Sequence, residues 1–424
     1  MKTDAQIEST NDALRVEGVT FTYHGAARPA LSGVRLAQAR GQMIGVMGAS
    51  GAGKSTLAKC LNRIIPEFED GDFRGAIHIA GESLDRHRVC DVAPKVGMVF
   101  QDFEAQLFST NVAHEVAFAM EQVGMDRAEM NRRIVPALEA VGLRGFEHRD
   151  PTSLSGGEKQ RLAIASVLAL RPSVIVLDEP TTDLDPEGRA EVFALIRKLR
   201  EQGLSLIVVE HESEELRASD RIVVLREGEI VIDGPPREVF ANSDLLERCG
   251  VRPPGLGRAL KLLGIDSQPD DVAQACDAIA RAYPRLAAES ASDSPPTSAP
   301  PPNLPASPPL VEVTGVSFSY PGGPRVLDSI DLKVDAGDFI AIVGQNGSGK
   351  TTLAKHIVGL LAPAAGSVML EGKDRIAMRP AETAREVAYV FQNPDHQIFA
   401  ATVEEEVAFG PRNFGLPADE IKRR

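Results

Sequence analysis

The sequence predicts an α/β fold that occurs twice in tandem, with the second copy incomplete. Three observations predict it. The apolar run 43–47 leads into a glycine-rich turn and then into a helix-like segment, and the same arrangement returns at 339–351. The apolar runs 174–177 and 206–209 each end in acidic or polar side chains. Buried parallel strands end in this way at the ligand-binding edge of an open α/β sheet.

The glycine-rich turn is the first element to justify. Its residues, Gly48-Ala-Ser-Gly-Ala-Gly-Lys54-Ser55, match the phosphate-loop pattern GxxxxGK[ST]. Glycines let backbone N–H groups surround a phosphate at the start of a helix. Lys54 is then expected to reach the β- and γ-phosphates, and the Ser55 hydroxyl to bind Mg²⁺. A chance match is expected roughly once in a hundred chains of this length. A second match at Gly344 to Thr351 makes chance a poor explanation.

Composition limits the function. A chain of 424 residues predicts two or three domains, and 43% hydrophobic with 25% charged residues is typical of a soluble globular protein. The net charge of −14, from 46 basic and 60 acidic residues, argues against a nucleic-acid surface. Four scattered cysteines form no CxxC pair, so neither a metal site nor a disulfide framework is expected. The N-terminus lacks the apolar core of a signal peptide, and no run is long enough for a membrane span, which predicts a cytosolic protein.

The internal repeat sets the domain organisation. Val16 to Tyr23 is echoed by Val313 to Tyr320, and the two loop lysines are 350 − 54 = 296 residues apart. The segments 97–101 and 105–118 recur at 388–392 and 396–409. We therefore predict a first domain at 1–242 and the N-terminal half of a second at 310–424. Residues 243–309 should hold helices near 244–249, 255–263 and 269–287, followed by a Pro-, Ser- and Ala-rich linker.

Further side chains of the first copy are candidates for the same site. Asp178 and Glu179 follow a buried-type strand, where Asp178 is suited to hold Mg²⁺ through its water shell and Glu179 to polarise an attacking water. Two acids that merely cap a strand are the competing interpretation. Ser155 is a natural N-cap and makes a second anion site with the glycines that follow. His211, at the end of another strand, is expected to contact the γ-phosphate, although a lone histidine is more often structural.

The order of these motifs carries a family resemblance. A phosphate loop, Val-Phe-Gln, Leu-Ser-Gly-Gly, Val-Leu-Asp-Glu-Pro, Thr-Asp-Leu-Asp and Val-Glu-His follow one another, and residues 14–240 resemble the ATP-binding-cassette (ABC) ATPases. The second copy resembles only the first half of that family. The resemblance implies a P-loop NTPase fold with a mixed sheet core, an antiparallel β subdomain and a helical subdomain. It also implies an ATPase that uses ATP and Mg²⁺.

The resemblance also implies site roles. Tyr23 and Tyr320 would stack on adenine, and Gln101 would sense Mg²⁺ and link to a membrane partner. Asp183 and Asp185 would lie in a loop that crosses the dimer. Glu158 departs from the glutamine that is common there. The catalytic set is Glu179, His211 and Gln101, and the metal set is Ser55, Asp178, Gln101 and Thr351. The ATP-binding set is Tyr23, Gly48, Ser50, Gly51, Gly53, Lys54, Ser55, Thr56, Ser155, Gly156, Gly157, Tyr320, Gly344, Asn346, Gly347, Gly349, Lys350, Thr351, Thr352 and Gln392.

The transport class follows from one stretch. Residues 391–399 and 404–411 resemble the ATPases of energy-coupling-factor (ECF) importers for vitamins and transition-metal ions, and residues 100–108 are a looser version. This resemblance implies peripheral attachment at the cytoplasmic face of the cell membrane. Its partners would be a transmembrane coupling protein and a substrate-binding component, with a second ABC domain in cis or from another chain and no nucleic acid.

The motif inventory leaves each site incomplete. The resemblance implies that each ATP lies between the phosphate loop of one cassette and the Ser-Gly-Gly segment of another. The Lys54 site lacks such an opposing Ser-Gly-Gly segment. The Lys350 site could use Ser155 and Gly157 but has no metal-holding Asp and no Glu. We therefore expect the 424 residues to be a truncated form of a longer tandem ATPase. Two alternatives stay open: a soluble tandem cassette protein that acts on ribosomes or DNA, and a nucleotide-binding fragment without turnover.

Overall fold

The computed structural model describes residues 12–269, 271–284, 309–392 and 397–424. They fall into two compact units, Met1–Pro295 and Pro296–Arg424. The boundary between them falls outside the described residues, as does most of the predicted linker, so the predicted domain limits stay a prediction. No helix within the described ranges combines the length and the apolar character that crossing a membrane requires.

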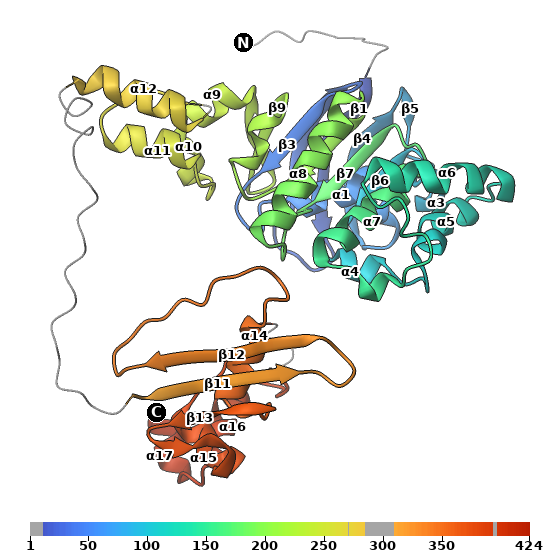
Figure 1. Ribbon diagram of the computed structural model, residues 1–424. Coiled ribbons are helices and arrows are strands. Elements are labelled where there is room, and N and C mark those ends of the chain that lie inside the picture. Colours follow the sequence, from blue (N-terminus) through green and yellow to red (C-terminus); the bar gives the residue numbers. More distant parts are fainter. Residues whose placement is uncertain (1–11, 270, 285–308, 393–396) are drawn as a thin grey trace. The chain divides into compact units, whose positions relative to one another are not determined.

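Two sheets form the first unit (Figure 1). The antiparallel sheet has the order β2-β1-β4-β5, and the second sheet has the order β10-β9-β3-β8-β7-β6. In the second sheet all neighbouring strands are parallel except β10 and β9. The strands are β1 (Asp12–Tyr23), β2 (Leu31–Ala39), β3 (Met43–Met47), β4 (Gly71–Ile79), β5 (Glu82–Ser83), β6 (Val96–Val99), β7 (Val174–Asp178), β8 (Ser205–Val209), β9 (Arg221–Arg226) and β10 (Glu229–Gly234).

Helices cover the second sheet and form two outlying groups. The group α4 to α7 gathers at one side of the sheet, and α9 to α12 follow β10 (Figure 1). The helices are α1 (Lys54–Leu61), α2 (Ile64–Glu67), α3 (Val89–Val92), α4 (Phe103–Gln106), α5 (Val112–Gln122), α6 (Arg127–Ala140), α7 (Gly156–Leu168), α8 (Pro186–Glu201), α9 (Pro236–Ala241), α10 (Ser243–Arg248), α11 (Gly255–Leu262) and α12 (Val272–Ala282), with 3₁₀ turns at Pro151–Ser153 and Glu215–Ala218.

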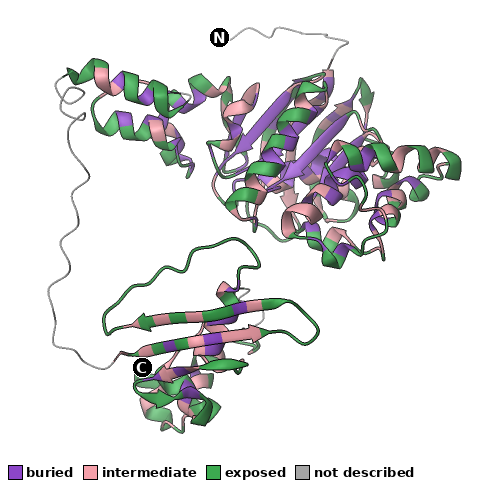
Figure 2. Ribbon diagram, in the orientation of Figure 1, coloured by how far each residue is buried: buried purple, intermediate pink, exposed green. Residues whose placement is uncertain are grey.

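The central strands are buried on both faces, which explains their uninterrupted apolar sequences. In β3, Met43 and Met47 pack into the core that α5 to α8 share, while Ile44 and Val46 pack against the antiparallel sheet and α1. The strands β7 and β8 alternate in the same way. Figure 2 shows these strands as buried. Side chains therefore fix the register of the sheet from both sides, and the loops after β3, β7 and β8 all lie at one edge.

Of the two sheets of the first unit, the described residues of the second unit repeat only the antiparallel one. Its sheet has the order β12-β11-β13-β14, which corresponds to β2-β1-β4-β5. The strands are β11 (Val311–Ser319), β12 (Arg325–Val334), β13 (Ala365–Leu370) and β14 (Lys373–Asp374). The helices are α14 (Lys350–Ile357), α15 (Pro380–Glu386), α16 (Val403–Asn413) and α17 (Ala418–Arg423), with a 3₁₀ turn at Arg375–Ala377.

The apolar run that precedes the second phosphate loop is not a strand. Residues 338–345 have no regular secondary structure, and the side chains of Phe339 and Val343 are 98% and 90% exposed. In the first unit the equivalent strand β3 is hydrogen-bonded to β8 and β9. Residues 310–392 and 397–424, which the structure describes, contain no counterpart of those two strands. The prediction that this apolar run forms a strand is therefore wrong, because such a strand depends on neighbouring strands that the described part of this unit does not supply.

Candidate functional site

The phosphate loop connects β3 to α1, as predicted. Gly53, the residue before α1, has a φ of 103°, and a Cβ there would lie 2.5 Å from the Ala30 carbonyl oxygen, so only glycine fits. The Lys54 ammonium is buried and donates hydrogen bonds to the carbonyl oxygens of Gly48 at 2.9 Å and Ala49 at 3.0 Å. Burial lowers the pKa of Lys54, and the carboxylates of Glu179 and Asp178 oppose that shift. The loop thus places a cation beside the positive end of a helix, where a phosphate is favoured.

A hydroxyl and a carboxylate meet beside this loop. The Ser55 hydroxyl donates a hydrogen bond to Asp178 Oδ1 at 3.3 Å, although the two residues are 123 positions apart. Burial raises the pKa of Asp178, and the Ser55 hydrogen bond and Lys54 counteract this effect. Hard oxygen donors of this kind fit Mg²⁺. Among the residues that the structure describes, no group of three or more His, Cys, Asp and Glu side chains could hold a metal ion. Phosphate oxygens and water would therefore have to supply the other ligands.

Glu179 lies at the centre of the next cluster. Its Oε1 is 2.6 Å from His211 Nε2, and its Oε2 accepts hydrogen bonds from Gln101 Nε2 at 2.8 Å and Thr182 Oγ1 at 3.3 Å. Its φ of 49° lies in the left-handed region, which costs about 1–2 kcal/mol for a residue with a side chain. A backbone hydrogen bond to Val209 oxygen at 3.0 Å stabilises that conformation. The structure therefore brings together the three residues predicted to be catalytic.

Sequence reasoning missed the contribution of Thr182. It is the second threonine after Glu179-Pro180, and its hydroxyl orients the Glu179 carboxylate. The signal was a pair of hydroxyl residues immediately after the acid pair, at the point where a loop leaves the sheet. Gln101, which was also predicted to be a metal ligand, bonds to Glu179 in this structure. Its role at a metal stays a prediction.

The Ser-Gly-Gly segment opens α7. Ser155 is the N-cap: its hydroxyl accepts a hydrogen bond from Glu158 N at 3.3 Å, and its own N–H donates to Glu158 Oε2 at 2.8 Å. Glutamate suits this position because its carboxylate completes a capping box. Within the described residues, no hydrogen bond joins Ser155 to residues 48–56. Asp185 caps α8 in the same manner by accepting from Gly188 N at 2.8 Å, while Asp183 has a φ of 67°.

The two candidate adenine platforms have matching contacts. The Tyr23 hydroxyl is 3.1 Å from Thr56 Oγ1, and burial raises the pKa of Tyr23. The Tyr320 hydroxyl is 3.3 Å from Thr352 Oγ1. Both rings are therefore tied to the helix that follows their own phosphate loop. Their stacking on adenine stays a prediction.

The second phosphate loop has the same local bonds in a more exposed setting. Lys350 Nζ donates to the carbonyl oxygens of Gly344 at 2.7 Å and Gln345 at 2.6 Å. Residues 341–348, which include most of the loop, are exposed (Figure 2). Thr351 and Gln392 are described and exposed as well. The site roles predicted for this copy, including those of Asn346, Gly347 and Gly349, stay predictions.

The helical extension after β10 contacts the phosphate loop, which the sequence did not indicate. Ala49 N donates a hydrogen bond to Cys249 oxygen at 3.2 Å, and Gly250 packs against Ala49. The loop that follows His211 is tied to the same extension, because Gly255 N donates to Glu214 Oε1 at 2.7 Å. Segments 41 to 200 residues apart thus support one site.

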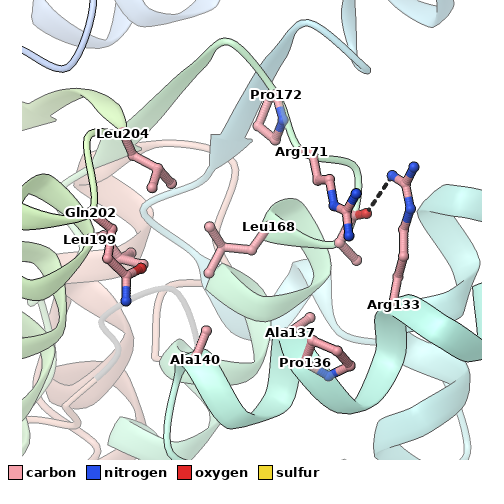
Figure 3. A pocket seen from close by; sticks show the side chains of 11 residues that line it. Arg133, Pro136, Ala137, Ala140, Leu168, Arg171, Pro172, Leu199, Gln202 and Leu204 are labelled. Atoms are coloured by element: carbon pink, nitrogen blue, oxygen red, sulfur yellow. Dashed lines mark hydrogen bonds between the residues drawn. The ribbon is translucent and has the colours of Figure 1, made fainter.

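A cavity of about 290 Å³ lies at the opposite edge of the sheet (Figure 3). Its lining comes from α6, the end of α7, the end of α8 and the residues that enter β7 and β8. Arg133 lies at its side and donates a hydrogen bond to Ala169 oxygen at 3.1 Å. The phosphate loop and Glu179 follow the other ends of the strands. This cavity is therefore separate from the candidate nucleotide site.

Comparisons with known proteins agree with this arrangement. A family model described as ABC transporter matches residues 31–182 and 327–423. A putative ABC transporter ATP-binding protein of Caldanaerobacter subterraneus subsp. tengcongensis is 42% identical, over 96% of this chain and 73% of its own length. A protein of the same description from Methanosarcina acetivorans is 38% identical, over 98% and 70%. Among solved structures, cbiO1 from Clostridium perfringens, described as part of the ABC transporter complex cbiONQ, is 30% identical. It has a TM-score of 0.51 and covers 59% of this chain and 99% of that chain.

Proposed function

The chain belongs to the ABC transporter family, and we propose that it is the ATP-hydrolysing subunit of an ECF-type importer that takes up a micronutrient, either a vitamin or a transition-metal ion. It is an ATPase of that family, with the P-loop fold that its sequence predicted. The observation that carries the proposal is the cluster of Glu179, His211 and Gln101 beside the buried Lys54 and Asp178.

The cluster supports a simple division of labour. Lys54 and the amides at the start of α1 would hold the β- and γ-phosphates of ATP. Glu179 would accept the proton of the attacking water, because its carboxylate is held in place by three hydrogen-bond partners. His211, 2.6 Å from that carboxylate, would contact the γ-phosphate and orient the base. Ser55 and Asp178 would hold Mg²⁺, which neutralises phosphate charge when bound.

A complete site requires a Ser-Gly-Gly segment from another cassette. Ser155 lies at an exposed helix start and makes its hydrogen bonds within its own helix. Its free side can therefore face a phosphate on a second molecule, where the helix N-terminus would stabilise negative charge. We propose that two first copies from separate chains, or a first copy and a complete partner cassette, close on ATP in this way.

The membrane partner would contact the segment around Gln101. The side chains of Phe108 and Phe118 form an edge-to-face pair at 4.5 Å, with 62% and 37% of their surfaces exposed. The same pair recurs in the second copy as Phe399 and Phe409 at 4.6 Å. Exposed aromatic pairs of this kind suit a protein interface. The importer assignment rests on this surface, on the ECF-like sequence near residue 391 and on the likeness to cbiO1.

Localisation tests the transport proposal. The chain should co-sediment with membranes of its own cell and co-purify with multi-spanning proteins after detergent extraction. Phe108→Glu should release it from membranes, because a charge would enter an apolar contact. Phe68→Glu is the matched control, since Phe68 is also exposed, at 72%, but lies on the segment that follows α2. Co-sedimentation with ribosomes or DNA, or equal retention of both variants, would contradict the proposal.

Uptake identifies the solute class. Cells with the intact system should accumulate one member of a panel of labelled vitamins, Co²⁺ and Ni²⁺, and Glu179→Gln should abolish that uptake without releasing the chain from membranes. Uptake that continues in this variant would separate transport from this ATP site.

A further inference from the structure

A further buried acid, Glu210, lies next to His211 in the sequence. Glu210 directly follows β8 and directly precedes His211, and only 3% of its surface is exposed. Acidic side chains are almost never buried to this extent unless they are paired or hydrogen-bonded. The proposed division of labour gives Glu210 no role, although it is bonded to the backbone of His211.

Its hydrogen bonds connect three segments at the edge of the sheet. Glu210 Oε1 accepts a hydrogen bond from Thr181 Oγ1, and its Oε2 accepts one from His211 N at 2.9 Å. Its own N–H donates to Val46 oxygen at the end of β3, at 3.1 Å. Thr181 is itself 2% exposed. Water therefore has little access to the Thr181 contact, and hydrogen bonds that water cannot replace hold their partners in place more strongly.

These hydrogen bonds form a closed cycle of contacts that includes Glu179, the proposed base. Thr181 comes two residues after Glu179, and His211 comes one residue after Glu210. Glu179 Oε1 and His211 Nε2 complete the circuit at 2.6 Å. A shift of either loop would therefore have to break a bond to Glu210 or lengthen the contact between Glu179 and His211.

We propose that Glu210 is a positioning residue: its buried carboxylate clamps the loop after Glu179 to the loop that carries His211 and so sets the geometry of that pair. The inference rests on the proposed hydrolytic roles of Glu179 and His211. Glu210 touches no reacting atom in this arrangement and acts through its two neighbours.

Three substitutions test the clamp by steady-state ATP turnover and equilibrium ATP binding of the full chain. Glu210→Ala should lower kcat at least tenfold and change the ATP dissociation constant less than twofold, because the phosphate loop is untouched. Glu210→Gln should restore most of the turnover, since its carbonyl can accept from His211 N while its amide donates to the threonine oxygen. Thr181→Val should lower kcat as well, and adding Glu210→Ala to it should cause little further loss.

Glu212→Ala is the matched control. Glu212 flanks His211 on its other side, is 56% exposed and pairs with Arg189 at 3.7 Å. Its removal should leave kcat within twofold of the wild-type value. A Glu210→Ala variant that loses thermal stability but keeps its kcat would overturn the proposal, because the acid would then be structural only. Additive losses in the double variant would also overturn it.

A spectroscopic measurement makes the test independent of turnover. With ¹³C-labelled histidine, the ring signal of His211, assigned by its loss in His211→Ala, should move in Glu210→Ala and Thr181→Val and stay in place in Glu212→Ala. An unchanged signal in Glu210→Ala would refute the clamp. By contrast, normal turnover in Glu179→Gln would refute the proposed hydrolytic site itself, so the two failures are distinguishable.

Discussion

Replacing Glu179 by glutamine should separate ATP binding from hydrolysis. Glutamine has the same shape, and its carbonyl can still accept hydrogen bonds from Gln101 and Thr182, which now reach Oε2 at 2.8 and 3.3 Å. Its amide can face His211. Most contacts survive, so the free energy of unfolding should change by less than about 1 kcal/mol, or a few degrees in Tm. The proton acceptor is lost, and a positioned base contributes about 10²–10⁴-fold, or roughly 3–5 kcal/mol of barrier.

The assay is phosphate release at saturating Mg²⁺ and ATP, measured as a function of chain concentration because the proposed site forms between two cassettes. We expect Glu179→Gln to lower kcat at least a hundredfold while the dissociation constant of ATP stays within about threefold. Glu212→Gln makes the same chemical change at an exposed acid nearby and should behave as the wild type. A kcat within threefold of the wild-type value in Glu179→Gln would remove Glu179 from the role of base.

The remaining predictions concern binding and the fold. Lys54→Ala should raise the ATP dissociation constant about tenfold to a hundredfold, since a bond to a charged group contributes about 1.5–3 kcal/mol, and unchanged affinity would contradict our placement of the loop. In an ATP titration, Gly250→Ala should weaken binding more than Gly264→Ala does. Both glycines have a positive φ, of 68° and 74°, but only a Cβ at Gly250 would contact the phosphate loop, 2.8 Å from the Ala49 side chain. Equal effects of the two substitutions would refute this coupling. Burial raises the pKa of Cys60 to about 12 from 9.0. As the pH rises, the unfolded chain would therefore lose the thiol proton before the folded chain does. The free energy of unfolding, measured in urea, should fall between these pH values, and it should fall less in Cys60→Ala. An equal fall in the wild type and the variant would contradict this prediction. A thiol reagent should modify two of the four cysteines of the native chain, Cys90 and Cys276, and rapid reaction of all four would contradict the burial of the others.

Local sequence was sufficient where the chain is buried on both faces. The runs at β3, β7 and β8 predicted their own strands, because continuous apolar residues have no stable alternative once helices cover both sides of a sheet. Their polar ends then had to meet at one edge. For this reason Lys54, Asp178, Glu179 and His211 could be assigned to one site from the sequence alone.

Contacts between loops could not be predicted in this way. The clamp from Glu210 to Thr181 joins side chains 29 residues apart, and the bond from Cys249 to the phosphate loop spans 200 residues. Nothing in the local pattern distinguishes a buried glutamate from the exposed Glu212 two residues later. Whether such a side chain is buried or exposed depends on which loops pack over the end of the strand, and that is decided only in the assembled sheet.

The apolar run at 339–343 also shows that a local sequence pattern does not determine structure by itself. Met43 and Met47 are fully buried in β3, a strand that lies between β8 and β9, whereas Phe339 and Val343, near the equivalent positions, are 98% and 90% exposed. Burial of one such side chain stabilises the fold by about 1.5–3 kcal/mol, so an apolar run forms a strand only where neighbouring elements can bury it. The same kind of sequence therefore forms a strand in one copy and none in the other. The deciding factor is the set of partners within reach, because apolar residues specify that a strand will be buried but cannot supply what buries it.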